Sequence, residues 1–472
     1  MNTFSKKSLH VALAGLSTLG LAGAAEAVMV NPNGLGQVLV YPYYTVRNGY
    51  NVGGVSAAPF NTLLSIVNTT ASTKAVKVRF REGKASKEVL DFNVFLSPYD
   101  MWTAAIEPDG AGGAMIETGD NSCTIPSFTK GVGVPFRQTL LGDAIGASAD
   151  RVTEGYFEVF EMATYLDTSK TAISAKHNSS GVPSCKDIND PTALSEQQIP
   201  LGGLSGGATI INVLTGDAFT EDATALVQYI DSANYENTGA PTPDFTQTFP
   251  TIGAAVNGQG QIISGTFAGL TAPVKAATAA FQRTSVINEF VLDKTTASGT
   301  DWVLTFPTKH HHLAGGLPPF QNGLSKIGSC DDIGIALYNR EEGPPGSTPG
   351  SDFSPLPPGS VGPALCWESN VLTFSNSNVL GSGNKYNIAT AESAGWMNLT
   401  FAYAGAINIA TSATGFDPTA GAVITPTTTF AGLPTIGFAV QTFVNGTLTD
   451  TAGKLIQSSY GGNFGHRYVG PQ

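Results

Sequence analysis

Charged residues are scarce in this chain of 472 residues. Only 13% are Asp, Glu, Lys or Arg, and 36 acidic against 24 basic side chains give a net charge of −12. Without a basic stripe to neutralise phosphates, the sequence disfavours nucleic acid as a partner and electrostatic binding to anionic lipid. Low charge together with 55 glycines is typical of all-β extracellular proteins whose surfaces are polar but uncharged.

Long hydrophobic runs are also absent. Beyond the N-terminus no stretch reaches the roughly 18 apolar residues of a membrane-spanning helix, so the sequence predicts none. Residues 1–27 combine a basic head at Lys6 and Lys7, a short apolar run and the small residues Ala25 and Ala27 at a signal-peptidase site. They predict a cleaved signal peptide and export to the cell surface, the extracellular space or the periplasm.

Only four cysteines are present: Cys123, Cys185, Cys330 and Cys366. No C-x-x-C spacing suggests zinc, and an even number in an exported chain predicts disulfides. Three connectivities are open. Chain order favours Cys123–Cys185 and Cys330–Cys366, because each pair closes a polar, turn-rich excursion.

Helical periodicity is weak, and strand patterns dominate. Apolar and basic residues alternate through 75–81, which predicts a strand with one buried face, whereas 61–68 is apolar on both faces. Polar turns join these segments at close spacing, and short helices are expected near 135–145 and 273–283, each opened by Pro. The fold class is all-β: an antiparallel β-sandwich, Ig-like or jelly-roll-like, with long Gly/Ser/Pro-rich loops such as 343–362 and a few short helices.

The domain organisation predicted here has three parts. Residues 1–27 form the signal peptide, 28–110 supply N-terminal sandwich strands, and 111–472 form a larger β-rich remainder packed on them. An outer-membrane barrel is the rival architecture, but regular ten-residue strands with aromatic girdles are missing.

One motif formally resembles a catalytic one. Gly203-Leu204-Ser205-Gly206-Gly207 matches G-x-S-x-G, the nucleophile elbow of α/β hydrolases, which requires a strand before the Ser and a helix after it. A strand pattern follows instead, so a loop is the simpler interpretation, and we predict a non-enzymatic protein.

Two groups of residues have metal-ligand chemistry. Asp109, Glu117 and Asp120 lie in a Gly-rich segment that could hold Ca²⁺, although no EF-hand pattern is present. His310 and His312 follow a strand and would share one face of it. Solvated loop carboxylates and an exposed polar strand end are the simpler interpretations, so no cofactor is expected apart from this calcium hypothesis.

Three tyrosines near a strand end, Tyr41, Tyr43 and Tyr44, are candidates for an exposed platform that stacks on sugar rings. The alternative is that they pack at the edge of the sandwich with their hydroxyls in water.

Several runs resemble a group of poorly characterised proteins exported by Gram-negative bacteria and described only as cell-surface proteins. These are YPYYT (41–45), NTLLSIVNTT (61–70), AVKVRFREG (75–83), EVLDFNVFLSPYDMW (88–102) and DWVLTFPTK (301–309). The resemblance implies an envelope or extracellular location and brings no catalytic residues. The leading hypothesis is a structural cell-surface protein that associates with itself or with envelope components, and the alternative is an extracellular glycan- or ligand-binding module.

Overall fold

The protein folds almost entirely as antiparallel β-sheet, which confirms the predicted fold class. The computed structural model describes residues 27–49, 58–188, 196–313, 318–341, 363–401, 407–410, 415–417, 422–424, 427–449, 451, 453 and 455–471. Two α-helices occur in this part, α1 (Lys170–Ala175) and α2 (Ala272–Phe281). Neither has the length and apolarity needed to cross a membrane. The predicted signal peptide lies outside the described residues, apart from Ala27.

The N-terminal half of the chain forms a sandwich of two sheets. The eight-stranded sheet contains, in spatial order, β1 (Met29–Val30), β14 (Thr224–Val227), β2 (Val38–Thr45), β10 (Glu154–Tyr165), β4 (Thr73–Glu82), β5 (Glu88–Leu96) and β8 (Cys123–Ile125), with β11 (Gln197–Gln198) on β10. The six-stranded sheet contains β13 (Ala218–Asp222), β12 (Leu204–Ile211), β3 (Asn61–Asn68), β6 (Met101–Pro108), β7 (Ala114–Glu117) and β9 (Val134–Pro135). Residue 110 falls between β6 and β7, so this sheet draws strands from both sides of that position.

The C-terminal half forms a second pair of sheets. The four-stranded sheet contains β21 (Gly334–Asn339), β25 (Ala394–Thr400), β18 (Ser285–Val291) and β33 (Arg467–Val469). The five-stranded sheet contains β24 (Lys385–Ile388), β23 (Ser369–Phe374), β19 (Gly299–Thr305), β31 (Ile436–Thr449) and β32 (Leu455–Gly465). The pair β23–β24 is parallel, unlike the other ladders of this sheet.

Smaller elements complete the fold. The two-stranded pairs are β15 (Ile252–Val256) with β16 (Ile262–Thr266), β17 (Gln282–Arg283) with β30 (Leu433–Pro434), β20 (Asp331–Asp332) with β22 (Ala364–Leu365), β26 (Ile407–Ala410) with β29 (Thr427–Phe430), and β27 (Gly415–Asp417) with β28 (Ala422–Ile424). The 3₁₀ turns are η1 (Gln138–Leu140), η2 (Ala149–Thr153), η4 (Phe245–Gln247) and η5 (Lys309–His311). Helix α2 lies where the sequence predicts it, with Pro273 in its first turn. The helix expected near 135–145 is reduced to the single turn η1.

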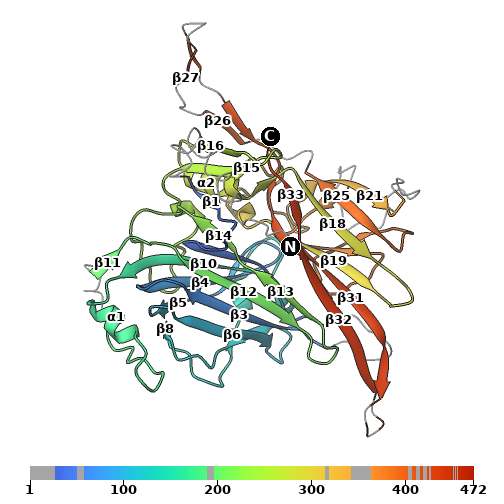
Figure 1. Ribbon diagram of the computed structural model, residues 1–472, viewed down its shortest axis with the longest axis horizontal. Helices are drawn as coiled ribbons and strands as arrows, with labels where there is room; N and C mark the ends of the chain where they lie inside the picture. Colours follow the sequence, from blue (N-terminus) through green and yellow to red (C-terminus); the bar gives the residue numbers. More distant parts are fainter. Residues whose placement is uncertain are drawn as a thin grey trace, which may run out of the picture.

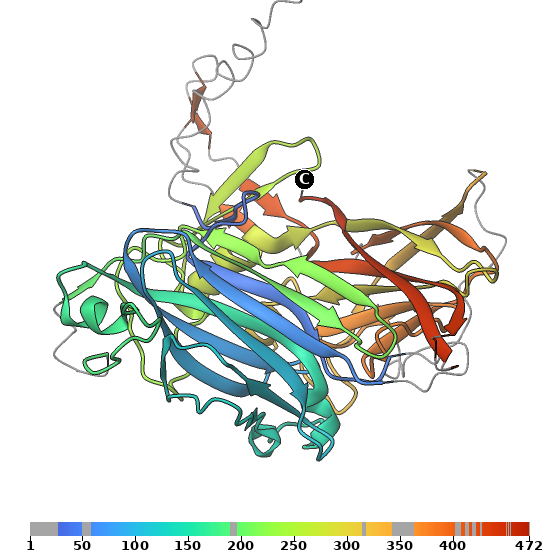
Figure 2. The same cartoon turned by 60° about the horizontal axis from the view of Figure 1, so that its bottom comes forward.

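The two halves lie side by side, with the blue-to-green N-terminal strands on one side and the yellow-to-red C-terminal strands on the other (Figures 1 and 2). Each sandwich has its own apolar core between its sheets. A further cluster joins the halves, with Tyr43 and Phe219 from one side packed against Val371 and Phe438 from the other. A single continuous interior therefore links both sandwiches.

Strand β4 is buried on both faces, so the prediction of one buried face is wrong. Lys77 Nζ donates to the carbonyl oxygens of Asn237, Ala240 and Thr242 at 2.8–3.1 Å. Arg79 Nη1 donates to further carbonyls of the same 235–243 segment. This distant segment covers the basic face and satisfies it, and sequence alternation alone could not reveal that cover.

Candidate functional site

Both predicted disulfides are present. Cys123 bonds to Cys185 and Cys330 bonds to Cys366, over separations of 62 and 36 residues. The first ties β8 to the chain after α1, and the second closes the base of the excursion that contains the Pro-rich residues 343–362, which themselves lie outside the described part. Two disulfides indicate an oxidising compartment.

The three candidate tyrosines Tyr41, Tyr43 and Tyr44 are buried, which contradicts both the candidate sugar platform and the alternative of hydroxyls left in water at the sandwich edge. Their exposed fractions are 0%, 1% and 0%, because β2 has strands on both sides and is covered on both faces. The hydroxyls bond within the protein: Tyr41 donates to Ser65 O at 2.6 Å and Tyr43 to Glu154 Oε2 at 2.7 Å. Burial raises the pKa of Tyr41 far above its ordinary value.

The candidate calcium ligands form hydrogen bonds with different groups instead of converging on one point. Asp109 accepts hydrogen bonds from the amides of Ala111 and Gly113, and Asp120 accepts from Thr103 N and from Ser122. Glu117 instead points outward from β7. Within the described ranges no group of three or more His, Cys, Asp or Glu side chains is arranged to hold a metal ion.

The histidine cluster is internal, so its predicted position at an exposed strand end is wrong. Strand β19 ends at Thr305, and His310 and His311 belong to the 3₁₀ turn η5, with ring centroids 3.8 Å apart. The side chain of His312 is buried, and its Nε2 lies 2.9 Å from Thr278 Oγ1. Burial lowers the pKa of His312 to about 4, so the ring is neutral at pH 7 and packs as part of the interior.

Ser205 lies at the second position of β12, opposite Val67 of β3. It therefore lacks the strand-to-helix turn that exposes a hydrolase nucleophile. The glycines of the motif have a packing role: a Cβ on Gly206 would lie 2.1 Å from Tyr41 Oη. The motif is explained by the close approach of β12 to β2.

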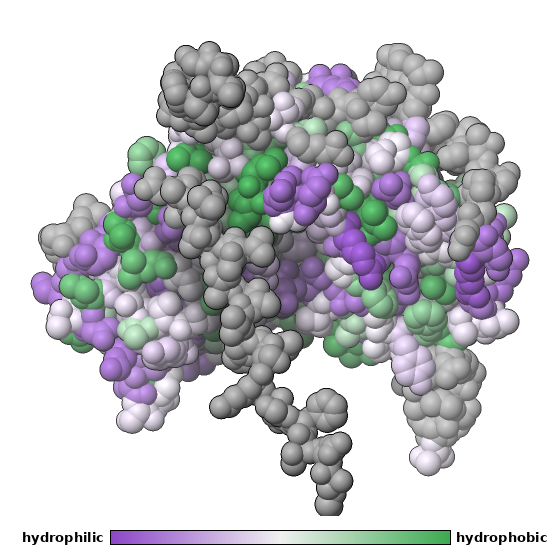
Figure 3. Space-filling view, turned by 45° about the horizontal axis from the view of Figure 1, so that its top comes forward, coloured by the Kyte–Doolittle hydropathy of each residue, from purple (hydrophilic) through white to green (hydrophobic). Residues whose placement is uncertain are grey.

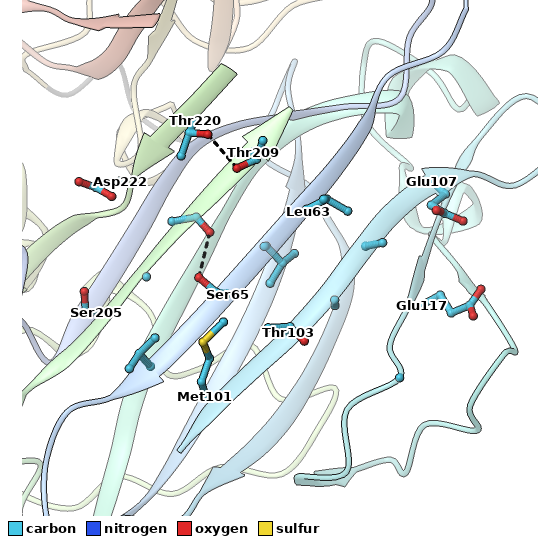
Figure 4. Close-up of a pocket in the computed structure, with 17 residues that line it drawn as sticks. Leu63, Ser65, Met101, Thr103, Glu107, Glu117, Ser205, Thr209, Thr220 and Asp222 are labelled. Carbon is cyan, nitrogen blue, oxygen red and sulfur yellow. Dashed lines mark hydrogen bonds between the residues drawn. The ribbon is translucent and has the colours of Figure 1, made fainter. Parts of the chain in front are cut away.

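The outer face of the six-stranded sheet forms an open groove of about 830 Å³ (Figure 4). Cross-strand pairing places its floor residues in rows, one of which runs Thr220–Thr209–Leu63–Ala105–Glu117 across β13, β12, β3, β6 and β7. Gly207 has no side chain, so nothing projects from the floor of the groove at this position. Leu63 and Met101 are 44% and 49% exposed on it.

The groove carries hydroxyl groups along its floor and carboxylates toward its ends. Glu107 and Glu117 lie at one end and Asp222 at the opposite side (Figure 4). Its lining contains neither a basic side chain nor a histidine. This lining suits uncharged or cationic groups and disfavours anions, and it supplies Ser205 with no histidine as a general base.

The edges of the four large sheets differ in length. Seven edge strands of these sheets are short, with only two to six residues each: β1, β8, β13, β9, β21, β33 and β24. Strand β32 is an edge strand of 11 residues, and its pairing with β31 continues to Thr449–Leu455, beyond the part of β31 that pairs with β19. Figure 1 shows this hairpin extending from the body.

Part of the β32 edge contacts the N-terminal sandwich. Asn463 Nδ2 donates to Glu221 Oε2 at 2.7 Å, and a Cβ on Gly461 would lie 3.2 Å from Ala218 O. Burial raises the pKa of Glu221 to about 8. Tyr460 and Phe464 on the same strand are 57% and 45% exposed. Neither the edge strand nor the groove was singled out from the sequence; the alternation in β32 is weak, and edge position is a property of the whole sheet.

On the face shown in Figure 3, hydrophobic residues form small groups separated by hydrophilic ones. No family model, curated protein or solved structure matches the chain.

Proposed function

We propose that the protein is an exported, non-enzymatic structural component of a bacterial cell surface, and that copies associate through the edge strand β32. The observation that carries this proposal is the length of that edge. Natural sheets blunt their edges with very short strands, charges or proline, because unpaired backbone N–H and C=O groups recruit further strands. The other seven edges follow this rule, and β32 departs from it over its outer part, since residues 461–463 already lie against β13.

The chemistry of β32 favours strand addition. Its sequence, LIQSSYGGNFG, contains neither a charged residue nor proline, and the exposed Tyr460 offers an aromatic side chain beside the outer part of the strand. The carbonyl of Phe464 already has a partner, because it accepts from Asn288 Nδ2 at 3.2 Å. An added strand gains main-chain hydrogen bonds from the edge and contacts from such side chains. A second copy of this chain can supply that strand through its own β32, in a two-fold arrangement.

Self-association is tested by sedimentation velocity and light scattering on the mature chain over a wide concentration range. The expected result is concentration-dependent growth beyond the monomer. The double variant Tyr460→Lys/Phe464→Lys should raise the concentration needed for assembly by about tenfold or more, because lysine on an edge strand opposes pairing.

A matched control is Leu270→Lys/Ile173→Lys, which adds the same charge at one fully exposed and one 63% exposed position away from β32. Assembly should be unchanged in this control. A wild-type chain that stays monomeric throughout, or equal effects of the two double variants, would contradict the proposal.

A further inference from the structure

Two aromatic side chains, the exposed Trp396 and the half-buried Tyr338, lie on the outer face of the four-stranded sheet. Tyr338 of β21 is directly opposite Trp396 of β25, and Trp396 is directly opposite Glu289 of β18. The two rings stack with centroids 4.1 Å apart and planes 14° apart. Trp396 remains 38% exposed although β25 is an internal strand of the sheet.

These residues line an open groove of about 640 Å³. Arg340, which follows β21, lies on the same groove, with Val291 and Ala394 between the charged side chains. Both Glu289 and Arg340 are exposed. In the described part of the chain, no salt bridge engages the Glu289 carboxylate or the Arg340 guanidinium. Hydrogen bonds from Thr295 and, more weakly, the charge of Arg340 lower the pKa of the Asp293 carboxyl. The groove thus combines an aromatic surface with an exposed acceptor and an exposed set of donors.

We propose that this groove binds a neutral carbohydrate chain built from β-linked hexopyranoses with equatorial hydroxyls, such as glucose or N-acetylglucosamine units. The faces of such rings present C–H groups, which pack on a flat aromatic surface like that of Trp396. Their hydroxyls project sideways from the ring, where the Glu289 carboxylate accepts and the Arg340 guanidinium donates hydrogen bonds. The proposal is independent of self-association through β32.

A purely structural role for the aromatic pair accounts for less of the geometry. Cross-strand aromatic pairs stabilise sheets, but sheet stability requires neither a groove nor exposed charges of both signs beside the rings. A structural pair also gains by burying its rings, whereas Trp396 stays accessible. Because the variants below can alter stability as well, the decisive measurement is affinity for sugar.

The test is titration of the mature chain with chitohexaose and with cellohexaose, followed by calorimetry and by tryptophan fluorescence. Of the other three tryptophans, Trp102 and Trp302 are fully buried and Trp367 is half-buried, so a change in emission that disappears in Trp396→Phe reports on the exposed ring. Trp396→Ala should weaken binding at least tenfold, equivalent to about 1.4 kcal/mol. Trp396→Phe, which keeps an aromatic ring, should retain most of the affinity, and Glu289→Gln should weaken binding by a smaller factor.

The control is Tyr99→Ala, which removes an aromatic side chain that is 72% exposed on a different part of the surface and should leave binding unchanged. Absence of saturable binding to either oligosaccharide overturns the proposal, as does wild-type affinity in a folded Trp396→Ala variant. A synthetic peptide of residues 343–362 serves as the competing probe. If the peptide binds and neither sugar does, the groove is a site for proline-rich segments and the carbohydrate proposal is wrong.

Discussion

The eight-stranded sheet of one sandwich and the four-stranded sheet of the other treat their outer faces in opposite ways. In the eight-stranded sheet, Lys77, Arg79 and Arg81 project from β4 into a fully covered layer in which carbonyls and carboxylates engage them. In the four-stranded sheet, Trp396 and Glu289 remain at the surface. Burying charged side chains is costly unless they are paired and hydrogen-bonded. The covered face therefore serves stability, and the open face is free for recognition.

The largest expected effect comes from breaking the covered face. Arg81 Nε donates to Glu158 Oε2 at 2.6 Å, and the two side chains are 6% and 0% exposed. Arg81→Met leaves the Glu158 carboxylate buried without this partner, so we expect a loss of about 3–5 kcal/mol in the free energy of unfolding. Urea unfolding measures the loss. Arg340→Met on the open face should change the free energy of unfolding by only about 0.5 kcal/mol. Similar losses in both variants would show that the covered and open faces do not differ in this way.

A smaller effect should appear as a pH dependence in the covered region. Burial raises the pKa of Glu368 to about 8, while the nearby Lys309 acts in the opposite direction. Because the folded state holds this proton more tightly than the unfolded state, the stabilisation is complete below about pH 4.5 and is lost as the pH rises through about 8.

The variant Glu368→Gln removes this titration. We expect the stability of the wild type to fall relative to the variant by about 1–3 kcal/mol between pH 5 and pH 8. Unfolding curves across this pH range measure the difference. Glu289→Gln on the open face is the matched control, and its free energy of unfolding should follow that of the wild type across this pH range. Parallel curves for Glu368→Gln would show that the Glu368 carboxyl is not perturbed.

The smallest effect concerns the open face itself. A double-mutant cycle with Tyr338→Ala and Trp396→Ala should give a coupling in unfolding free energy of about 0.5–1.5 kcal/mol for the stacked pair. Each single variant should remain folded. A coupling of several kcal/mol would mean that the aromatic pair is a structural element comparable to the covered face.

Local sequence patterns predicted the features that depend on near neighbours. The alternation in β4 and the apolar run of β3 identified strands, and Pro273 marked the start of α2. The pairing Cys330–Cys366 followed from chain order, because both cysteines lie at the base of one turn-rich excursion.

Features that depend on distant parts of the chain were mispredicted or missed. Tyr41 was placed either on an exposed platform or at the sandwich edge, because no local signal shows that β2 is internal to an eight-stranded sheet. His312 looked exposed because its partner Thr278 belongs to α2, 34 residues earlier. A signal for Trp396 was present: in AGWMNLT, Met397 and Leu399 alternate with polar residues, which places the tryptophan on the polar face.

The cluster shared by the two halves has a consequence for how the protein is made. Tyr43, Phe60 and Phe219 are synthesised early, whereas Phe438 and Val440, which pack in the same cluster, are synthesised close to the end of the chain. A chain that emerges from its N-terminus therefore carries an uncovered apolar surface until β31 is delivered. During that interval this surface is open to aggregation, and chains that terminate before Phe438 are expected to be degraded or to aggregate instead of accumulating as half-molecules.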